Sequence, residues 1–182
     1  MHIKSVYLRI ALTILSWIIF IGVSIEAGGF LFNMFYFLFA GPEGPGFFYN
    51  HLELRPLFQY DKGHFIVMTG LMSLVAMLRA TLFYVIIQMI TRKDLSLSSP
   101  FNPLARKYIV INAWIAIVIG FFSKYGTDYA TWLGTKGIGL PSVEQMRLGG
   151  ADVWLFMGVT LFVIAQVFKR GIELQAEHDL TV

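Results

Sequence analysis

The residue most suited to binding chemistry is an arginine in the middle of a long apolar run, Arg79 within residues 65–90. A charged side chain at the centre of a bilayer costs at least about 3 kcal/mol, so it faces a bundle interior or a cavity and finds a partner there. We favour a structural role, in which Arg79 donates hydrogen bonds to a buried amide, hydroxyl or carbonyl group. The functional alternative is a site between helices for an anion or a lipid head group. A third interpretation is that the span is misplaced.

Polar residues in the other apolar runs are candidate partners for Arg79. Counting along helices at about 1.5 Å per residue places Asn112 at nearly the same depth as Arg79, and Ser16 is a further candidate. Glu26 is an acid within the first predicted span, but the same count places it about 10 Å nearer the outer surface than Arg79. There, water or a loop cation such as Arg147 could reach its carboxylate. We therefore treat Arg79, Asn112 and Glu26 as the candidate ligand- or anion-binding residues.

Asp61 and His64 are three residues apart at the start of the second apolar run, with His51 and Glu53 upstream. Carboxylate oxygens and imidazole nitrogens are common metal ligands. The pattern is more typical of a helix start with an acidic first turn and a histidine at the membrane interface, so Asp61 and His64 are weak metal candidates only. The chain has no cysteine, and no catalytic triad, phosphate loop or carboxylate pair stands out. We predict no catalytic residue, no cofactor and no enzymatic activity.

The last residues form a short acidic tail. Glu173, Glu177 and Asp179 follow the basic pair Lys169-Arg170, which ends the last apolar run. The anionic inner leaflet attracts basic segments and therefore repels such a tail. One interpretation is a solvated helix end that only helps to fix topology. The other is a contact surface for a basic partner, such as a small DNA-binding regulator, and the three acids are then the candidate partner-binding residues.

The apolar composition indicates the class of protein that must position these residues. Hydrophobic residues make up 57% of the chain and charged residues 14%, whereas soluble domains carry about a quarter charged residues. The apolar residues also occur in runs of about twenty, the length of a helix that spans a bilayer. The net charge of +3 gives no case for direct nucleic-acid binding. We predict an all-α polytopic membrane protein, a single domain with a bundle of four transmembrane helices.

The breaks between the apolar runs give the predicted boundaries. The four spans are about residues 10–31, 65–90, 106–123 and 151–170. The connecting parts are the outer loops 41–64 and 124–150, the cytoplasmic connector 91–105 and the cytoplasmic tail 171–182. The aromatic segment 30–39 either prolongs the first helix or lies in the membrane interface.

Two capping patterns occur in the connecting segments. Asn102 followed by Pro103 is typical of an N-cap and a first helical position. Ser142 and Gln145 have the spacing of a capping box, which predicts a short helix ending at Gly149-Gly150.

Basic residues favour a cytoplasmic location for both termini. With the termini inside, the inner surface carries eight basic residues: Lys4, Arg9, Arg92, Lys93, Arg106, Lys107, Lys169 and Arg170. The outer loops carry five: Arg55, Lys62, Lys124, Lys136 and Arg147. Because cytoplasmic span ends are rich in lysine and arginine, this difference predicts the orientation.

The end of the chain also resembles a known family. The segment from Phe168 to Val182, FKRGIELQAEHDLTV, resembles the closing signature of small four-helix bacterial membrane proteins of domain-of-unknown-function family 2975. Pro100-Phe101-Asn102 resembles the opening of that family's inner connector, although Pro103-Leu104 departs from its usual polar continuation. The resemblance implies the bacterial cytoplasmic (inner) membrane, no established activity, and a small helix-turn-helix regulator as a candidate partner.

These features together predict a non-enzymatic integral membrane protein that binds a partner. The partner is a small cytoplasmic helix-turn-helix regulator docked on the acidic tail, or another membrane subunit. One alternative is a small carrier or a lipid- or anion-binding protein that uses the Arg79 region. Another is an accessory subunit of a larger membrane complex, held through phenylalanine-rich surfaces that face lipid.

Overall fold

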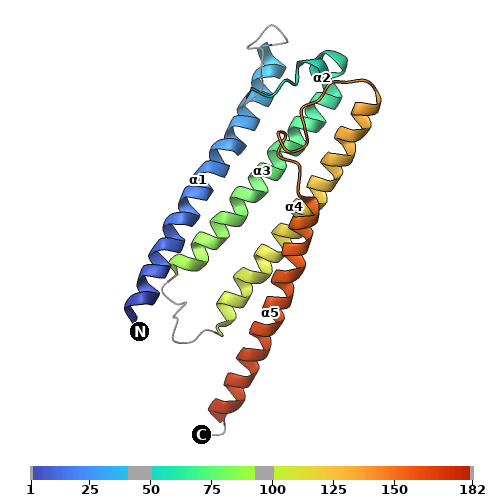
Figure 1. The fold of residues 1–182 in the computed structure, drawn as a ribbon. Coiled ribbons are helices and arrows are strands. Elements are labelled where there is room, and N and C mark those ends of the chain that lie inside the picture. Colours follow the sequence, from blue (N-terminus) through green and yellow to red (C-terminus); the bar gives the residue numbers. More distant parts are fainter. Residues whose placement is uncertain (1, 41–50, 93–100, 181–182) are drawn as a thin grey trace.

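The structure, a computed structural model, describes residues 2–40, 51–92 and 101–180 of the 182-residue chain. The regular elements of this part of the chain are helices, which confirms the all-α prediction (Figure 1). In chain order they are α1 (His2–Ala40), α2 (Arg55–Tyr60), α3 (Lys62–Thr91), α4 (Pro103–Thr135) and α5 (Ala151–Leu180).

Four helices of the described chain are long and apolar enough to cross a membrane. They are Tyr7–Ala40, Lys62–Thr91, Pro103–Thr135 and Ala151–His178. Within their most apolar stretches, α1 and α5 bury only 6% and 11% of their residues inside the protein, whereas α3 and α4 bury 33% and 39%. α1 and α5 therefore leave most of their apolar side chains exposed at the surface of the protein.

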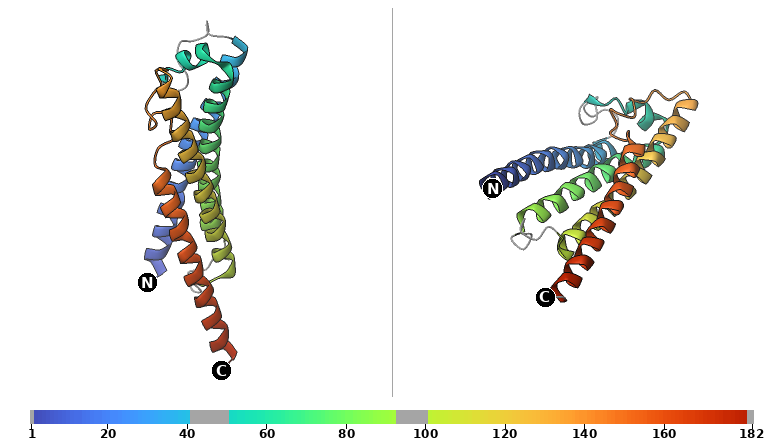
Figure 2. Two further views of the ribbon diagram at one scale, coloured as in Figure 1. Left: turned by 90° about the vertical axis from the view of Figure 1, so that its right-hand side faces the viewer. Right: turned by 60° about the horizontal axis from the view of Figure 1, so that its bottom comes forward.

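The four long helices form an open row. α1 packs against α3, α3 against α4 and α4 against α5, while the short α2 lies against α3. Within the described residues, α1 and α5 have no close backbone contact with each other. Figure 2 shows them on opposite edges of the row. α3 and α4 are therefore the middle helices, and the edge helices each pack along one long neighbour.

α5 begins opposite the middle of α4. A Cβ atom added to Gly120 would lie 2.7 Å from Cγ of Leu155 and 3.1 Å from the carbonyl oxygen of Ala151. One added to Gly158 would lie 2.7 Å from Cδ1 of Ile117. Because glycine leaves room for the facing helix, the two backbones approach closely at these points. The other end of α5 extends beyond the start of α4 (Figure 1).

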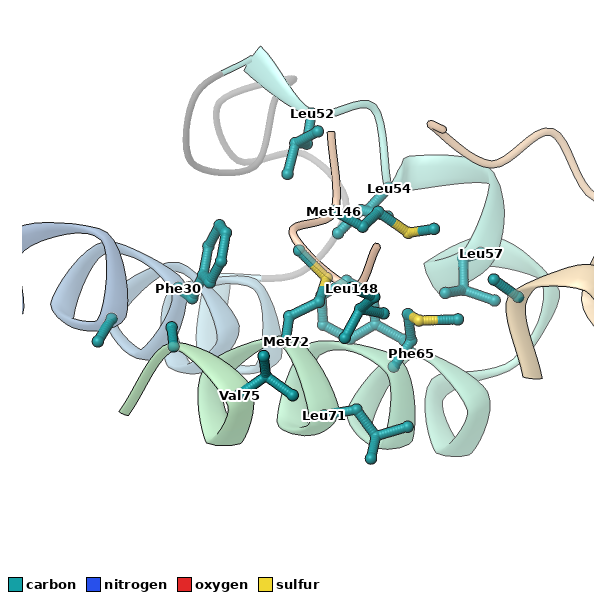
Figure 3. Close-up of a cluster of buried hydrophobic side chains, with 14 of the residues drawn as sticks. Phe30, Leu52, Leu54, Leu57, Phe65, Leu71, Met72, Val75, Met146 and Leu148 are labelled. Carbon is teal, nitrogen blue, oxygen red and sulfur yellow. The ribbon is translucent and has the colours of Figure 1, made fainter. Parts of the chain in front are cut away.

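Fully buried apolar side chains gather where the long helices meet α2, at one end of the bundle along the helix axes (Figure 3). Phe30 of α1, Phe65 and Met72 of α3, and Leu148 of the segment after α4 are each at most 1% exposed. The segment between α4 and α5 is therefore part of the core, rather than a loop lying on its surface.

The second outer loop is shorter than the sequence predicts. Residues 124–135, predicted as loop, belong to α4. Lys124 and Asp128 lie on the exposed side of this part of the helix and form an ion pair of 2.7 Å one turn apart. Ala130 lies on the buried side. Composition does not reveal this extension of the helix, because a polar, aromatic stretch can be an amphipathic helix when one side of it packs.

Other boundaries are extended or confirmed. The aromatic segment 30–39 prolongs α1 as helix. The predicted loop 41–64 contains α2 and the first residues of α3, and residues 41–50 lie outside the described chain. Asn102 is the N-cap of α4, because its side chain accepts a hydrogen bond of 2.8 Å from the backbone N–H of Leu104, and Pro103 follows it in the first turn.

Candidate functional site

The segment between α4 and α5 contains the predicted capping box. The backbone N–H of Ser142 donates to Oε1 of Gln145 at 2.9 Å, and the backbone N–H of Gln145 donates to Oγ of Ser142 at 3.2 Å. The predicted short helix, however, is a single turn, since residues 143–147 form turns rather than a helix. Its end is not at Gly149-Gly150 but earlier, at Arg147.

The turn ends with Arg147 in a left-handed backbone conformation, with φ of +60°. The N–H of Leu148 donates to the carbonyl of Val143, and that of Arg147 to the carbonyl of Glu144, both at 3.0 Å. This pair of bonds is a Schellman motif, in which the left-handed position usually holds glycine. The left-handed conformation costs a residue with a Cβ atom about 1–2 kcal/mol. The backbone alone would favour glycine at this position, so contacts of the arginine side chain must offset the cost.

The Arg147 side chain reaches across to α1. Its Nε donates to Oε1 of Glu26 at 2.7 Å, and the side chains of Arg147 and Glu26 are 53% and 15% exposed. Arg147 is thus the loop cation that reaches Glu26, as the sequence indicates. The ion pair joins the segment after α4 to α1, although the two residues are 121 positions apart in the chain.

Arg79 contacts an aromatic ring rather than the predicted amide. Its Cζ lies 5.3 Å from the centroid of the Trp154 ring, in the first turn of α5. The predicted hydrogen bond to Asn112 is absent, since Nε of Arg79 and Oδ1 of Asn112 are both buried without a hydrogen-bond partner among the described residues. A depth count along helices does not fix which sides face each other, and for this reason the prediction of Asn112 as the partner was wrong. Ser16 is buried, and no bond joins it to Arg79 within the described chain.

The charges near Arg79 do not balance. Among the described residues, Glu26 and Arg147 both interact electrostatically with Arg79, so this group contains two cations and one anion. The carboxylate of Glu26 is already hydrogen bonded to Arg147. Burial strengthens the field of an uncompensated charge, because less water screens it.

A cavity of about 760 Å³ lies between the segment before α2 and the turn after α4. Its polar lining residues are His51, Glu53, Glu144, Gln145 and Arg147. Its apolar walls are Leu52, Pro56, Gly139, Leu140 and Pro141. The cavity is within the size range of small-molecule sites. The sequence did not reveal it, because its two sides are nearly a hundred residues apart in the chain.

Asp61 and His64, the weak metal candidates, have structural partners. Asp61 is the N-cap of α3 and accepts a hydrogen bond of 2.9 Å from the backbone N–H of His64. Nδ1 of His64 lies 2.5 Å from the hydroxyl oxygen of Tyr129 on α4. Within the described residues, no three His, Asp or Glu side chains are grouped closely enough to hold a metal.

The acidic tail is helical, and one of its acids forms ion pairs with basic residues of the same helix. α5 continues to Leu180, and Glu173 forms ion pairs with Lys169 at 3.8 Å and with Arg170 at 3.3 Å. Glu177 is exposed, and Asp179 lies in the last turn of the described helix. Glu173 therefore pairs with basic residues inside the helix, in addition to its candidate role in partner binding.

Comparisons of the chain with protein-family models, with curated proteins and with solved structures found no match. The resemblance to domain-of-unknown-function family 2975 stays a prediction.

Replacing Arg147 separates its backbone cost from its side-chain contact. We expect Arg147→Gly to leave the free energy of unfolding unchanged or to raise it, because relief of about 1 kcal/mol of left-handed strain offsets a half-exposed ion pair of about 0.2–1 kcal/mol. Arg147→Ala keeps the strain and loses the pair, so it should be destabilising. Denaturant unfolding in detergent micelles measures both variants. A greater loss of stability in Arg147→Gly than in Arg147→Ala would contradict this account.

Proposed function

We propose that this chain is a non-enzymatic multi-pass membrane protein that binds an anionic group at Arg79. The observation that carries the proposal is the state of the Arg79 guanidinium. Its Nε is buried without a hydrogen-bond partner among the described residues, while the carboxylate that could neutralise it, Glu26, is held by Arg147. A buried N–H donor without an acceptor destabilises the folded protein until an acceptor binds to it.

The geometry of Arg79 favours a planar or tetrahedral oxyanion. The Trp154 ring lies 5.3 Å from Cζ and occupies one side of the guanidinium by a cation–π contact. The N–H groups point along the edges of the guanidinium plane, where carboxylate or phosphate oxygens bind in pairs. The ligand class is therefore a carboxylate or a phosphate, carried by a small molecule or by a phospholipid head group.

The proposed orientation places both termini in the cytoplasm of a bacterial cell, with the protein in the inner membrane. Both described ends of the chain lie at the same end of the bundle along the helix axes, the end opposite α2 (Figure 1). At that end Arg9 donates hydrogen bonds of 2.9 Å to the carbonyl oxygens of Ile90 and Arg92, and Arg170 is exposed. A concentration of basic side chains at one end supports a cytoplasmic location for it.

The projection of α5 favours a second candidate function, the docking of a cytoplasmic partner. α5 extends past the start of α4 as a single helix (Figure 2). Leu174 in this part is 65% exposed, and Glu177 is exposed as well. A basic protein, such as a small helix-turn-helix regulator, fits the acidic charge of this helix, and Glu173, Glu177 and Asp179 are the candidate contact residues.

Replacing Arg79 tests the anion site. Arg79→Leu should fold, since it removes a buried polar group together with its cost, and it should lose the anion that the unmodified protein retains. Native mass spectrometry after gentle purification identifies co-purifying phospholipid, and titration with inorganic phosphate or acetate tests a free anion. Arg170→Leu, which removes an exposed charge from α5 far from Arg79, is the matched control. Anion binding that survives Arg79→Leu would refute the proposal.

Cysteine labelling tests the orientation. With a membrane-impermeant thiol reagent on intact cells, Gly137→Cys should be labelled and His178→Cys should not. The chain has no native cysteine, so each label reports one position. Labelling of His178→Cys alone would reverse the proposed orientation.

Charge removal on α5 tests the docking function. We expect Glu177→Gln combined with Asp179→Asn, and separately Glu173→Gln, to weaken the binding of a co-purifying basic protein, because each removes negative charge from the helix. The unmodified complex should also weaken at high salt, which screens exposed charges. Pull-down from membranes at low and high salt gives the measurement. An equal set of co-purifying proteins from all variants would exclude docking through these acids.

A further inference from the structure

The cavity of about 760 Å³ beside the start of α2 is lined by one cation, Arg147, and by two carboxylates, Glu53 and Glu144. Nε of Arg147 is used by Glu26, but its two terminal amino groups have no hydrogen bond within the described chain. Glu53 and Glu144 also have no ion pair or hydrogen bond among the described residues. His51 is the remaining titratable group of the lining.

The backbone of this cavity is strained on both sides. In the described chain the non-glycine residues with positive φ are His51 and Arg147, both at +60°. Both line this cavity, one on each side. Strained residues persist where surrounding contacts over-determine them, and they gather at binding sites.

Buried neighbours hold the strained positions in place. Leu52 follows His51 and is 5% exposed, and Met146 and Leu148 on either side of Arg147 are both 0% exposed. Figure 3 shows Leu52, Leu54 and Met146 close together in the core beside the two segments. Since its neighbours point into the core, the Arg147 side chain is directed to the cavity and to Glu26. The charged groups are thus presented from a fixed backbone, which lowers the entropy cost of binding.

We propose that this cavity binds a small zwitterion that carries a primary ammonium group and a carboxylate or phosphate. The terminal amino groups of Arg147 donate to the anionic group, while Glu53 and Glu144 accept from the ammonium. The apolar part of the ligand lies against Leu52 and Leu140. An α-amino acid and a phosphoethanolamine group both have this chemistry.

The charges of the lining select against ligands with one charge. A simple amine would leave the terminal amino groups of Arg147 without an acceptor. A simple carboxylate would meet two carboxylates that repel it. A zwitterion satisfies both signs at once, and discrimination of this kind arises from repulsion as well as attraction. This site is separate from Arg79, although the Glu26–Arg147 pair adjoins both.

Matched probes test the proposal on the whole protein in phosphatidylcholine nanodiscs. The probes are L-leucine, 4-methylpentanoate (leucine without its ammonium), 3-methylbutylamine (leucine without its carboxylate) and O-phosphoethanolamine, with calorimetric titration as the measurement. L-leucine or O-phosphoethanolamine should bind, and both single-charge analogues should bind at least about tenfold more weakly, because each loses its hydrogen bonds to a charged group. The relative affinities of the two zwitterions identify the carboxylate or the phosphate as the preferred anion.

Variants assign the two charges. Glu53→Gln with Glu144→Gln should remove the preference for L-leucine over 4-methylpentanoate, and Arg147→Gly should remove the preference over 3-methylbutylamine. Glu173→Gln on the distant end of α5 is the matched control and should change nothing. Arg79→Leu should keep zwitterion binding, so a failure of the Arg79 site and a failure of this one are distinguishable.

Several results would overturn the proposal. Absence of binding by both zwitterions excludes the site. Equal affinity for L-leucine and 3-methylbutylamine shows a cation site instead, and equal affinity for L-leucine and 4-methylpentanoate shows an anion site. If Arg147→Gly does not fold, as judged by gel filtration and circular dichroism, the double glutamine variant still decides: unchanged probe preferences in it refute the role of Glu53 and Glu144.

Discussion

The close approach of α4 and α5 is the constraint on which the rest of the arrangement depends. Gly120 and Gly158 leave room for side chains and backbone of the facing helix, at distances that a Cβ atom does not tolerate. α5 therefore starts opposite the middle of α4, and the second half of α4 is covered by the segment 136–150 instead. Leu148 of that segment packs against Gly126, where an added Cβ atom would lie 2.9 Å from its Cδ1.

This displacement brings charged groups from three parts of the chain together. The buried Met146 and Leu148 hold the turn against the core, and the left-handed Arg147 between them reaches Glu26 of α1. Trp154, in the first turn of α5, meets Arg79 of α3. Opposite charges attract strongly where water is scarce. Glu26 forms its ion pair with Arg147, and Arg79 has no ion pair among the described residues.

Features with local causes could be predicted from the sequence. The caps Asp61 and Asn102, and the Ser142–Gln145 capping box, bind backbone or side-chain groups within three residues, so spacing alone determines them. The apolar helices follow from hydropathy in the same way. The helical stretch 124–135 was missed because its stability comes from packing on one side, which composition does not reveal.

The sequence by itself determined the helical class, the four apolar helices, the local caps and the presence of costly charges within them. Only the tertiary structure decided which groups those charges meet. Arg79 and Asn112 have similar depth by residue count, yet the rotation of the helices and the displaced start of α5 give Arg79 a tryptophan ring instead. The cavity joins residues near position 51 to residues near position 147. Such pairings depend on helix rotation and axial displacement, which side-chain packing between distant segments sets and no local sequence pattern encodes.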